Sequence, residues 1–366
     1  MSKQEKLTKE NLLKQVSKQE ALFLVCGSSF LKGKFYQELS RLPVRLSIFN
    51  DFSPNPDIQS VRRGIEAFHQ SGADTILAAG GGSAIDVAKS IKAYATEQAD
   101  KSSLNQKIAE NDIVLIAVPT TAGSGSEATH FAVIYQEGIK QSVAHSSLLP
   151  TQVALLPELL ESLPLYQRKT TMLDAFCHAI ESFWSVKSTE KSRQYAKESI
   201  QETLQFYEGY LNNTPEGNQG MLLAAHKAGQ AINLSQTTAA HAMSYKLTSL
   251  YGISHGHAVA LCLSVIWPFM WRNRDNCTDT RGRLYLEDIF VQIAKAMGEP
   301  TPQGAIEKYT KILTTLQLSV PKGTEADISS LTEAVNVQRL KNNPVALTKE
   351  IIQCLYEELL GGKNES

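Results

Sequence analysis

The feature that most constrains the fold is a change of pattern near residue 160. Before it, short apolar runs of β-type composition alternate with amphipathic segments. After it, apolar residues recur at helical spacing for about 200 residues. Strands that alternate with helices predict a parallel sheet covered on both faces. We therefore expect an N-terminal α/β domain over residues 1–163 and an all-helical domain over residues 164–366.

Four apolar runs are the expected strands, and two amphipathic segments between them are the expected helices. The strands are Ala21–Cys26, Arg45–Phe49, Thr75–Ala79 and Ile113–Val118, and the helices are Ile58–Ser71 and Ala84–Ala95. Ahead of the first strand, Leu7–Leu24 has a helical pattern that leads into it. A length of 366 residues exceeds what one hydrophobic core usually supports, which agrees with two domains.

The composition excludes several classes of function. The chain has 36 basic and 37 acidic residues, so it lacks the basic excess of a nucleic-acid-binding surface. Its longest apolar run, Ala258–Trp267, is about half the roughly 20 residues that a membrane helix needs. The polar N-terminus has no apolar signal core, and the five cysteines are widely spaced, as is typical of reduced thiols. We expect a cytoplasmic protein without nucleic-acid or membrane partners.

A glycine-rich turn follows the third expected strand. Gly80–Ser83 has three consecutive glycines and opens a helix that carries Asp86 and Lys89. The backbone amides of such a turn can approach a phosphate closely, and the helix N-terminus favours negative charge. The alternative is a tight turn without a ligand. The segment has neither the Gly-x-Gly-x-x-Gly nor the Walker pattern, so it does not specify which nucleotide is bound.

A second polar loop, Pro119–Glu127, follows the strand Ile113–Val118. It contains two glycines and several hydroxyl side chains, which suit a ribose or a nicotinamide carboxamide. Taken alone, the loop is equally compatible with a solvated turn. The carboxyl ends of parallel strands meet at one edge of a sheet, so the two loops together favour a nucleotide site there.

Four side chains in the helical half have the composition of a metal site. Asp174 and His178 are four residues apart on an expected helix, so they share one face. His241 and His255 follow. One carboxylate and three imidazoles suit a borderline divalent ion such as Fe²⁺ or Zn²⁺. The alternative is a set of structural core histidines, because the long gap between His178 and His241 gives no information on their distance.

Together these motifs resemble the iron-containing (group III) alcohol dehydrogenases, over roughly residues 20–360. They occur in that family's order: Phe52–Pro56, Gly80–Lys89, Pro119–Glu127, Asp174-x-x-x-His178, and His241 with His255–Gly256. The resemblance implies a dinucleotide-binding α/β domain, a helical domain, a divalent metal (iron before zinc) and NADPH or NADH. It places the metal ligands at Asp174, His178, His241 and His255. It places the cofactor site at Gly27, Ser28, Gly80, Gly81, Gly82, Ser83, Asp86, Lys89, Thr120, Thr121, Ser124 and Ser126.

Four positions depart from the family's pattern. Tyr245 stands where many members have a histidine assigned to proton transfer. Gly27 stands where members that prefer NAD often have an acidic residue, and its lack of charge permits the 2′-phosphate of NADPH. Leu156-Pro157 replaces the usual Asp-Pro. The N-terminal β-hairpin is not evident, which puts in doubt the way that the family forms its usual homodimer.

The segments His241–Lys246 and His255–Ala258 look most like the branch that includes phosphonoacetaldehyde reductases. That similarity implies reduction of phosphonoacetaldehyde to 2-hydroxyethylphosphonate, with Lys246 near the anionic tail of the substrate. The alternative for Lys246 is an ordinary surface lysine. Sulfoacetaldehyde, a semialdehyde and a neutral short aldehyde are alternative substrates. An alternative from another class is a lyase of the dehydroquinate-synthase kind, which normally has a glutamate where Asp174 stands.

The implied reaction needs a Lewis acid, a hydride and a proton. A divalent ion would polarise the aldehyde oxygen, and the nicotinamide would deliver the hydride. The candidate proton sources are Tyr245, His257, a water at the metal and the hydroxyls of the nicotinamide ribose. His257 is favoured because histidine titrates near neutral pH. The alternative for His257 is a structural histidine bonded to the backbone.

Overall fold

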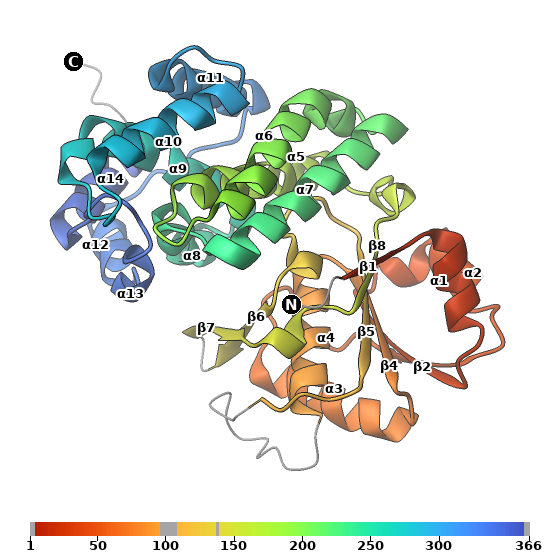
Figure 1. Cartoon of the computed structure of the whole chain (residues 1–366). Helices are drawn as coiled ribbons and strands as arrows, with labels where there is room; N and C mark the ends of the chain where they lie inside the picture. The colour runs from red at the N-terminus through yellow and green to blue at the C-terminus, as the bar shows by residue number, and fades with distance from the viewer. Residues whose placement is uncertain (1–3, 96–107, 137–138, 362–366) are drawn as a thin grey trace. The chain divides into compact units, whose positions relative to one another are not determined.

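The computed structural model describes residues 4–95, 108–136 and 139–361 (Figure 1). The chain divides into two compact units, residues 1–163 and 164–366. The first unit comprises β1 (Glu5–Leu7), α1 (Lys9–Val16), β2 (Ala21–Cys26), η1 (Phe30–Lys32), α2 (Lys34–Leu39), β3 (Arg45–Phe49), α3 (Ile58–Ser71), β4 (Thr75–Gly80), α4 (Gly82–Tyr94), β5 (Val114–Pro119), η2 (Ser126–Ala128), β6 (Phe131–Gln136), β7 (Ile139–Ala144), η3 (Ser146–Leu148), β8 (Gln152–Ala154) and η4 (Pro157–Leu160). The second comprises α5 (Leu165–Trp184), α6 (Glu190–Leu211), α7 (Pro215–Ser235), α8 (Ala239–Tyr251), α9 (His255–Arg272), η5 (Arg274–Asn276), α10 (Arg283–Ala296), α11 (Pro302–Leu316), α12 (Glu325–Glu333), α13 (Val337–Leu340) and α14 (Lys349–Leu360).

The first unit is built on a six-stranded sheet in the order β1-β8-β5-β4-β2-β3, with all neighbouring strands parallel. Alternate side chains of β2 point to opposite faces, because successive residues of a strand alternate. Phe23 and Val25 pack with α3 and α4 in one core, and Leu22 and Leu24 pack with α1 and α2 in the other. Figure 1 shows these two helix pairs on opposite sides of the sheet. The predicted doubly covered parallel sheet is confirmed.

The predicted strands and helices agree closely with the structure, whereas the N-terminal helix was predicted too long. The bounds of β2, β3 and α3 are those predicted, and β4, β5 and α4 differ by one or two residues. The helical pattern over Leu7–Leu24 yields only α1, because Leu7 belongs to β1 and the last four residues to β2. Strand β1 pairs in parallel with β8, so the described N-terminal residues form no β-hairpin.

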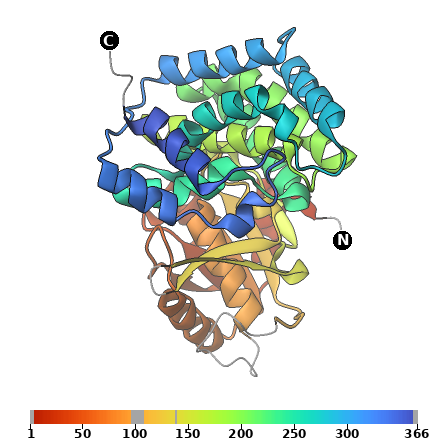
Figure 2. The same ribbon diagram turned by 90° about the vertical axis from the view of Figure 1, so that its left-hand side faces the viewer.

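Strands β6 and β7, which the sequence analysis did not predict, form a separate antiparallel pair. This ribbon packs on α4, and Figure 2 shows it in yellow beside the orange helices. A bridge between Asp57 and Tyr135 fastens the ribbon to the N-terminal end of α3. The ribbon therefore adds a layer on the helix that follows the glycine-rich turn.

In the second unit, α5 is the central helix and packs against α6, α7, α9 and α10. It approaches Gly256 in the first turn of α9 closely. A Cβ added to Gly256 would lie 2.0 Å from the carbonyl oxygen of Thr170 and 2.8 Å from Cβ of Asp174. Only glycine permits this spacing, which places the start of α9 directly against α5.

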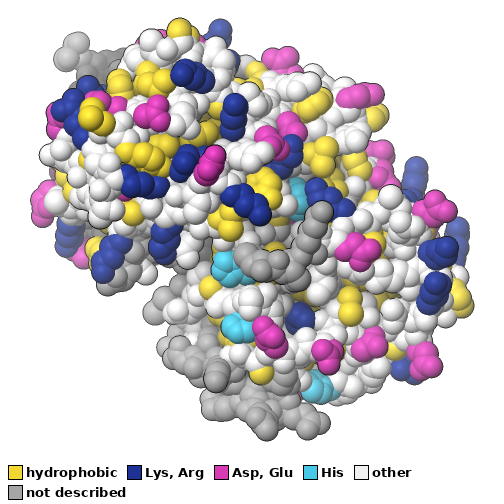
Figure 3. Space-filling view, viewed as in Figure 1, with side chains coloured by type: hydrophobic (Ala, Val, Ile, Leu, Met, Phe, Trp, Pro, Cys, Tyr) yellow, Lys and Arg dark blue, Asp and Glu magenta, His cyan; other side chains and the backbone are white. Residues whose placement is uncertain are grey.

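The surface shows no segregation of charge on the face drawn in Figure 3, where acidic and basic side chains are interspersed. Within residues 4–95, 108–136 and 139–361, no helix is both long enough and apolar enough to cross a membrane.

Candidate functional site

Helix α5 presents three polar side chains to the interior of the second unit. Asp174 and His178 are four residues apart, and Glu181 follows one turn later, so all three share a face of the helix. Asp174 and His178 are buried, and Glu181 has no exposed surface. Because an isolated buried charge is costly, these groups need partners of opposite charge or a bound ion.

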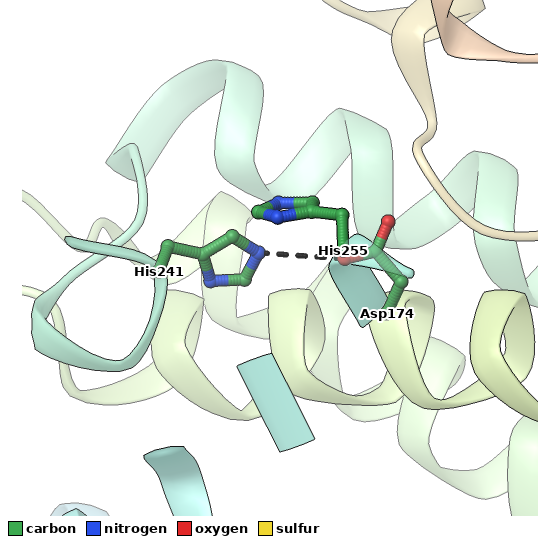
Figure 4. Close-up of side chains that lie close together, drawn as sticks. All are labelled: Asp174, His241 and His255. Atoms are coloured by element: carbon green, nitrogen blue, oxygen red, sulfur yellow. Dashed lines mark ion pairs between the residues drawn. The ribbon is translucent and has the colours of Figure 1, made fainter. Parts of the chain in front are cut away.

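Asp174, His241 and His255 converge from α5, α8 and the start of α9 (Figure 4). Their candidate ligand atoms all lie within 4.8 Å of one another. Nε2 of His241 is 3.6 Å from Oδ1 of Asp174, and both atoms are buried without a hydrogen bond. Two ligands about 2.1 Å from one tetrahedral ion lie about 3.4 Å apart. The observed spacing and the lack of hydrogen bonds therefore fit a bridging divalent ion.

His178, the fourth predicted ligand, lies beside this group without being part of it. Its ring stacks on that of His241, with centroids 4.4 Å apart and planes inclined by 17°. In the described structure all four predicted ligands are therefore neighbours, and the ligand atoms of three of them face a common point.

Charge interactions within the group outweigh the effect of burial. Burial alone would raise the pKa of Asp174, but the neighbouring His178, His255 and His241 hold it well below its usual range. Burial alone would lower the pKa of His241, but Glu181 and Asp174 raise it to about 9. The carboxylate is therefore ionised and ready to bind a cation. A metal that binds His241 at neutral pH must displace a proton.

Glu181 was not identified from the sequence. Its Oε2 contacts Nδ1 of His241, while Oε1 accepts hydrogen bonds from the amide of Thr238 (3.1 Å), its hydroxyl (2.6 Å) and the amide of Ala240 (3.0 Å). Burial would raise the pKa of Glu181, but the charge of His241 and the hydrogen bonds from the side chains of His241 and Thr238 lower it. The sequence did contain a signal, because Glu181 is seven residues after Asp174 and therefore on the same helix face.

The predicted catalytic residues Tyr245 and Lys246 occupy different faces of α8. Tyr245 is one turn after His241, and its ring stacks on His255 with centroids 5.6 Å apart. Lys246 is exposed. Five residues of helix rotate it by about 140° from His241. The described structure shows Tyr245 next to the ligand group and gives Lys246 no contact with it.

His257, the third predicted catalytic residue, also points away from the metal group. It is two residues after His255 on α9, a rotation of about 200°. It is buried, and its Nδ1 is 3.2 Å from the hydroxyl of Tyr166. Burial lowers the pKa of His257, and a hydrogen bond from its ring to the backbone carbonyl of Ser319 opposes this only in part. Tyr166 is 40% exposed, so any proton transfer from the buried His257 to a substrate would pass through the Tyr166 hydroxyl.

The two predicted nucleotide-binding loops meet at the carboxyl edge of the sheet. The amide of Thr120 donates to the carbonyl of Gly80 (2.9 Å). A Cβ on Gly81 would lie 3.4 Å from Thr121, and one on Gly82 would lie 3.0 Å from Ser124. Gly81 is the N-cap of α4, and no side chain caps that helix. The first turn of α4 is therefore suited to a phosphate.

Asp86, Lys89 and Ser126 support this edge from inside. The Lys89 ammonium has no exposed surface, and it donates to Ser126 Oγ (3.0 Å), Thr129 Oγ1 (2.9 Å) and the carbonyl of Phe131 (2.8 Å). These bonds use all three of its protons. Asp86 in turn accepts from Ser126 Oγ (2.5 Å). Because its donors are occupied, Lys89 supports the loop in the described structure, and its role in cofactor binding stays a prediction.

The remaining predicted positions lie around the same edge. Ser83 donates to the carbonyl of Pro54, which links the glycine-rich turn to the Phe52–Pro56 motif. Gly27 and Ser28 follow β2, the neighbour of β4. A Cβ on Gly27 would meet no atom within 4 Å, so the space above it is open.

Comparison with known proteins assigns the family. Residues 5–157 match the family described as iron-containing alcohol dehydrogenase, and residues 169–360 match its C-terminal region. The chain belongs to the iron-containing alcohol dehydrogenases and is an oxidoreductase that interconverts aldehydes and alcohols. This confirms the resemblance found in the sequence, and it disfavours the alternative of a dehydroquinate-synthase-like lyase.

The names of individual relatives specify different substrates for those proteins. The phosphonoacetaldehyde reductase of Streptomyces viridochromogenes is 30% identical over 334 residues, 87% of this chain and 82% of that protein. The choline dehydrogenase of Bacillus subtilis is 28% identical over 342 residues, 88% and 82% of the two chains. The sulfoacetaldehyde reductase of Bifidobacterium kashiwanohense, solved with NAD⁺, is 25% identical, with a TM-score of 0.85 over 98% of each chain. This structural similarity confirms the fold.

Proposed function

We propose that this protein reduces a small anionic aldehyde, phosphonoacetaldehyde before others, to the primary alcohol, with NAD(P)H and a divalent metal. The metal requirement rests on the group of Asp174, His241 and His255, in which Oδ1 of Asp174 and Nε2 of His241 are buried without a hydrogen bond. The substrate class rests on two relatives whose names specify two-carbon aldehydes with a phosphonate or sulfonate group.

Asp174, His178, His241 and His255 are the proposed ligands. The bound ion would polarise the aldehyde oxygen as a Lewis acid. Iron is the first choice because of the family, and zinc also suits one carboxylate with three imidazoles. The Asp174 carboxylate would partly neutralise the ion, while the histidines fix its place among α5, α8 and α9.

Gly81, Gly82, Thr121 and Ser124 are the proposed contacts of the cofactor. The uncapped first turn of α4 would hold the pyrophosphate, and the hydroxyl side chains would hold the ribose and carboxamide. Gly27 offers open space and no negative charge, so we propose that NADPH is accepted. The sulfoacetaldehyde reductase was solved with NAD⁺, so both nucleotides belong in the test.

The contacts of Tyr245 and His257 favour Tyr245 as the first candidate for the proton donor, whereas the sequence alone favoured His257. Tyr245 contacts a candidate ligand ring directly, whereas His257 contacts Tyr166 on another side of α9. We therefore place Tyr245 first as the donor to the product oxygen. His257 would act only through the Tyr166 hydroxyl.

A role for Lys246 in substrate binding and a homodimeric state are two further proposals. Lys246 is exposed, so it can meet an anionic group from solvent, but it is on a different face of α8 from His241. Lys246→Gln should raise the KM for phosphonoacetaldehyde but not for propanal if the lysine binds the anionic tail. A homodimer is the proposal from the family, and light scattering at several concentrations measures it.

The test is NADPH and NADH oxidation by the metal-loaded protein with phosphonoacetaldehyde, sulfoacetaldehyde, succinic semialdehyde and propanal. We expect the highest kcat/KM with phosphonoacetaldehyde. A preference for propanal, or equal rates with all four, would refute the anionic substrate and leave the dehydrogenase class intact. Net consumption of the nicotinamide cofactor also separates this activity from a lyase that recycles its cofactor.

A further inference from the structure

We infer that Glu181 is a positioning residue that fixes the tautomer of His241, so that Nε2 faces the metal without a proton. The inference rests on the proposed metal site. Glu181 reaches His241 from α5, and the contact is made at Nδ1, the ring nitrogen opposite to the one near Asp174. The imidazole therefore lies between two carboxylates, one at each nitrogen.

The hydrogen bonds around Glu181 determine which atom faces His241. Oε1 accepts from the amides of Thr238 and Ala240 and from the Thr238 hydroxyl, at 2.6–3.1 Å. Backbone amides only donate, so the atom that meets them must be an acceptor. This leaves Oε2, also an acceptor in the ionised carboxylate, against Nδ1 of His241. In the neutral imidazole that remains once a metal has displaced one proton, Nδ1 must then carry the proton, and the lone pair of Nε2 faces the metal.

The same carboxylate has a second, structural role. Thr238 is the N-cap of α8, and its own side chain does not cap the helix. Glu181 supplies the missing acceptor for the first turn of α8, where negative charge is also favoured by the helix dipole. A test must therefore separate the orientation of His241 from the stability of α8.

Glu181→Gln makes this separation. The amide oxygen of the glutamine must stay at the Oε1 position, because the two backbone amides need an acceptor there. The NH₂ group then meets Nδ1 of His241 as a donor. His241 is forced into the other neutral tautomer, with the proton on Nε2, where the metal should bind. The variant therefore keeps the cap of α8, but it moves the proton of His241 from Nδ1 to Nε2.

The measurement is the Zn²⁺ dissociation constant by chelator competition, together with the visible spectrum of the Co²⁺-loaded protein. For Glu181→Gln we expect binding about 10–100-fold weaker, the usual effect of losing an outer-shell partner of a metal-bound histidine. We also expect an altered Co²⁺ spectrum at saturation. A purely structural role would lower the melting temperature and leave the saturated spectrum unchanged.

Two further variants serve as controls. Glu202→Gln makes the same chemical change on α6, where the carboxylate contacts Lys227, and should not alter metal binding. Thr238→Val removes one donor to Oε1 and leaves the contact between Glu181 and His241 intact. It should reduce stability while changing the dissociation constant less than about 3-fold.

The outcomes distinguish the inference from the proposed function. Wild-type protein that binds no divalent ion would refute both. Wild-type binding with equal affinity and equal spectra for Glu181→Gln would refute the inference alone. If Glu181→Gln does not fold, ¹⁵N shifts of the histidine rings in Zn²⁺-loaded wild-type protein decide the question. Nδ1 protonated and Nε2 metal-bound in His241 supports the inference, and the reverse assignment overturns it.

Discussion

Gly256→Ala should disrupt the metal site by separating two helices. The added Cβ would lie 2.0 Å from the Thr170 carbonyl oxygen and 2.8 Å from Cβ of Asp174, where ordinary contacts begin at 3.4 Å. The obstacle is backbone, so α5 and α9 must move apart by about 1.0–1.4 Å, which is what separates 2.0 Å from the 3.0–3.4 Å that a Cβ contact needs. Such overpacking costs about 1–3 kcal/mol. Since each kcal/mol lowers the melting temperature of a domain of this size by about 2–4 °C, we expect a fall of roughly 2–12 °C.

The same movement acts on the ligands. His255 precedes Gly256 in the chain, and Asp174 is on the opposing helix. A metal site tolerates deviations of about 0.2 Å in its bond lengths, so a shift near 1 Å should weaken binding at least about 10-fold. Thermal unfolding of the metal-free protein and Zn²⁺ titration against a chelator measure the two effects separately.

Gly304→Ala is the matched control in the same unit. Its added Cβ would approach the flexible side-chain oxygen of Glu299 at 3.2 Å. Because alanine is the better helix former, the control should be neutral or stabilising by up to about 1 kcal/mol. A Gly256→Ala protein that melts within about 1 °C of wild type and binds Zn²⁺ equally well would refute this account of how α9 is placed.

Four further predictions concern single side chains. His255→Ala should lose both the metal and turnover, and full activity with stoichiometric metal would remove it from the ligand set. His257→Ala should reduce kcat about 10-fold without changing metal content, and an unchanged pH–rate profile would exclude a role in proton transfer. Gly27→Asp should lower kcat/KM for NADPH relative to NADH about 10-fold or more, and an unaltered ratio would show that this position does not face the 2′-phosphate. Burial lowers the pKa of Lys89 from its ordinary 10.5 to about 8, so between these pH values the unfolded chain holds a proton that the folded chain has released. Wild type should therefore gain stability over Lys89→Met as pH rises from 8 to 10.5, by up to about 3 kcal/mol in denaturant unfolding, and parallel pH dependences would contradict the buried charge.

Three of the four strands that were predicted from the sequence, β2, β4 and β5, have a long apolar run. β2 and β4 are buried on both faces, so their composition alone marks them. β1 and β8 have three residues each, too few for any periodicity, and they exist because each pairs with a neighbour. The β6–β7 ribbon likewise depends on its packing against α4, which local sequence does not encode.

In the candidate site, too, some features follow from local sequence and others depend on tertiary contacts. Helical spacing relates Asp174 to His178, and it could also have indicated Glu181 on the next turn. The proximity of His255 to them depends on the contact of α5 with α9 at Gly256, and that of His241 depends on its contact with Glu181; both contacts are tertiary. The opposite directions of His255 and His257 follow from helix geometry, but only once the start of α9 is known.

The most direct test of the central claim is an anaerobic titration of metal-stripped protein with Fe²⁺, with NADPH oxidation followed at each step. The aldehyde used is whichever of phosphonoacetaldehyde, sulfoacetaldehyde, succinic semialdehyde and propanal gives the highest kcat/KM. We expect no activity without metal and a linear rise that ends at one ion per chain. Full activity in the stripped protein, or activity that does not follow bound metal, would contradict a metal-dependent reductase built on Asp174, His178, His241 and His255.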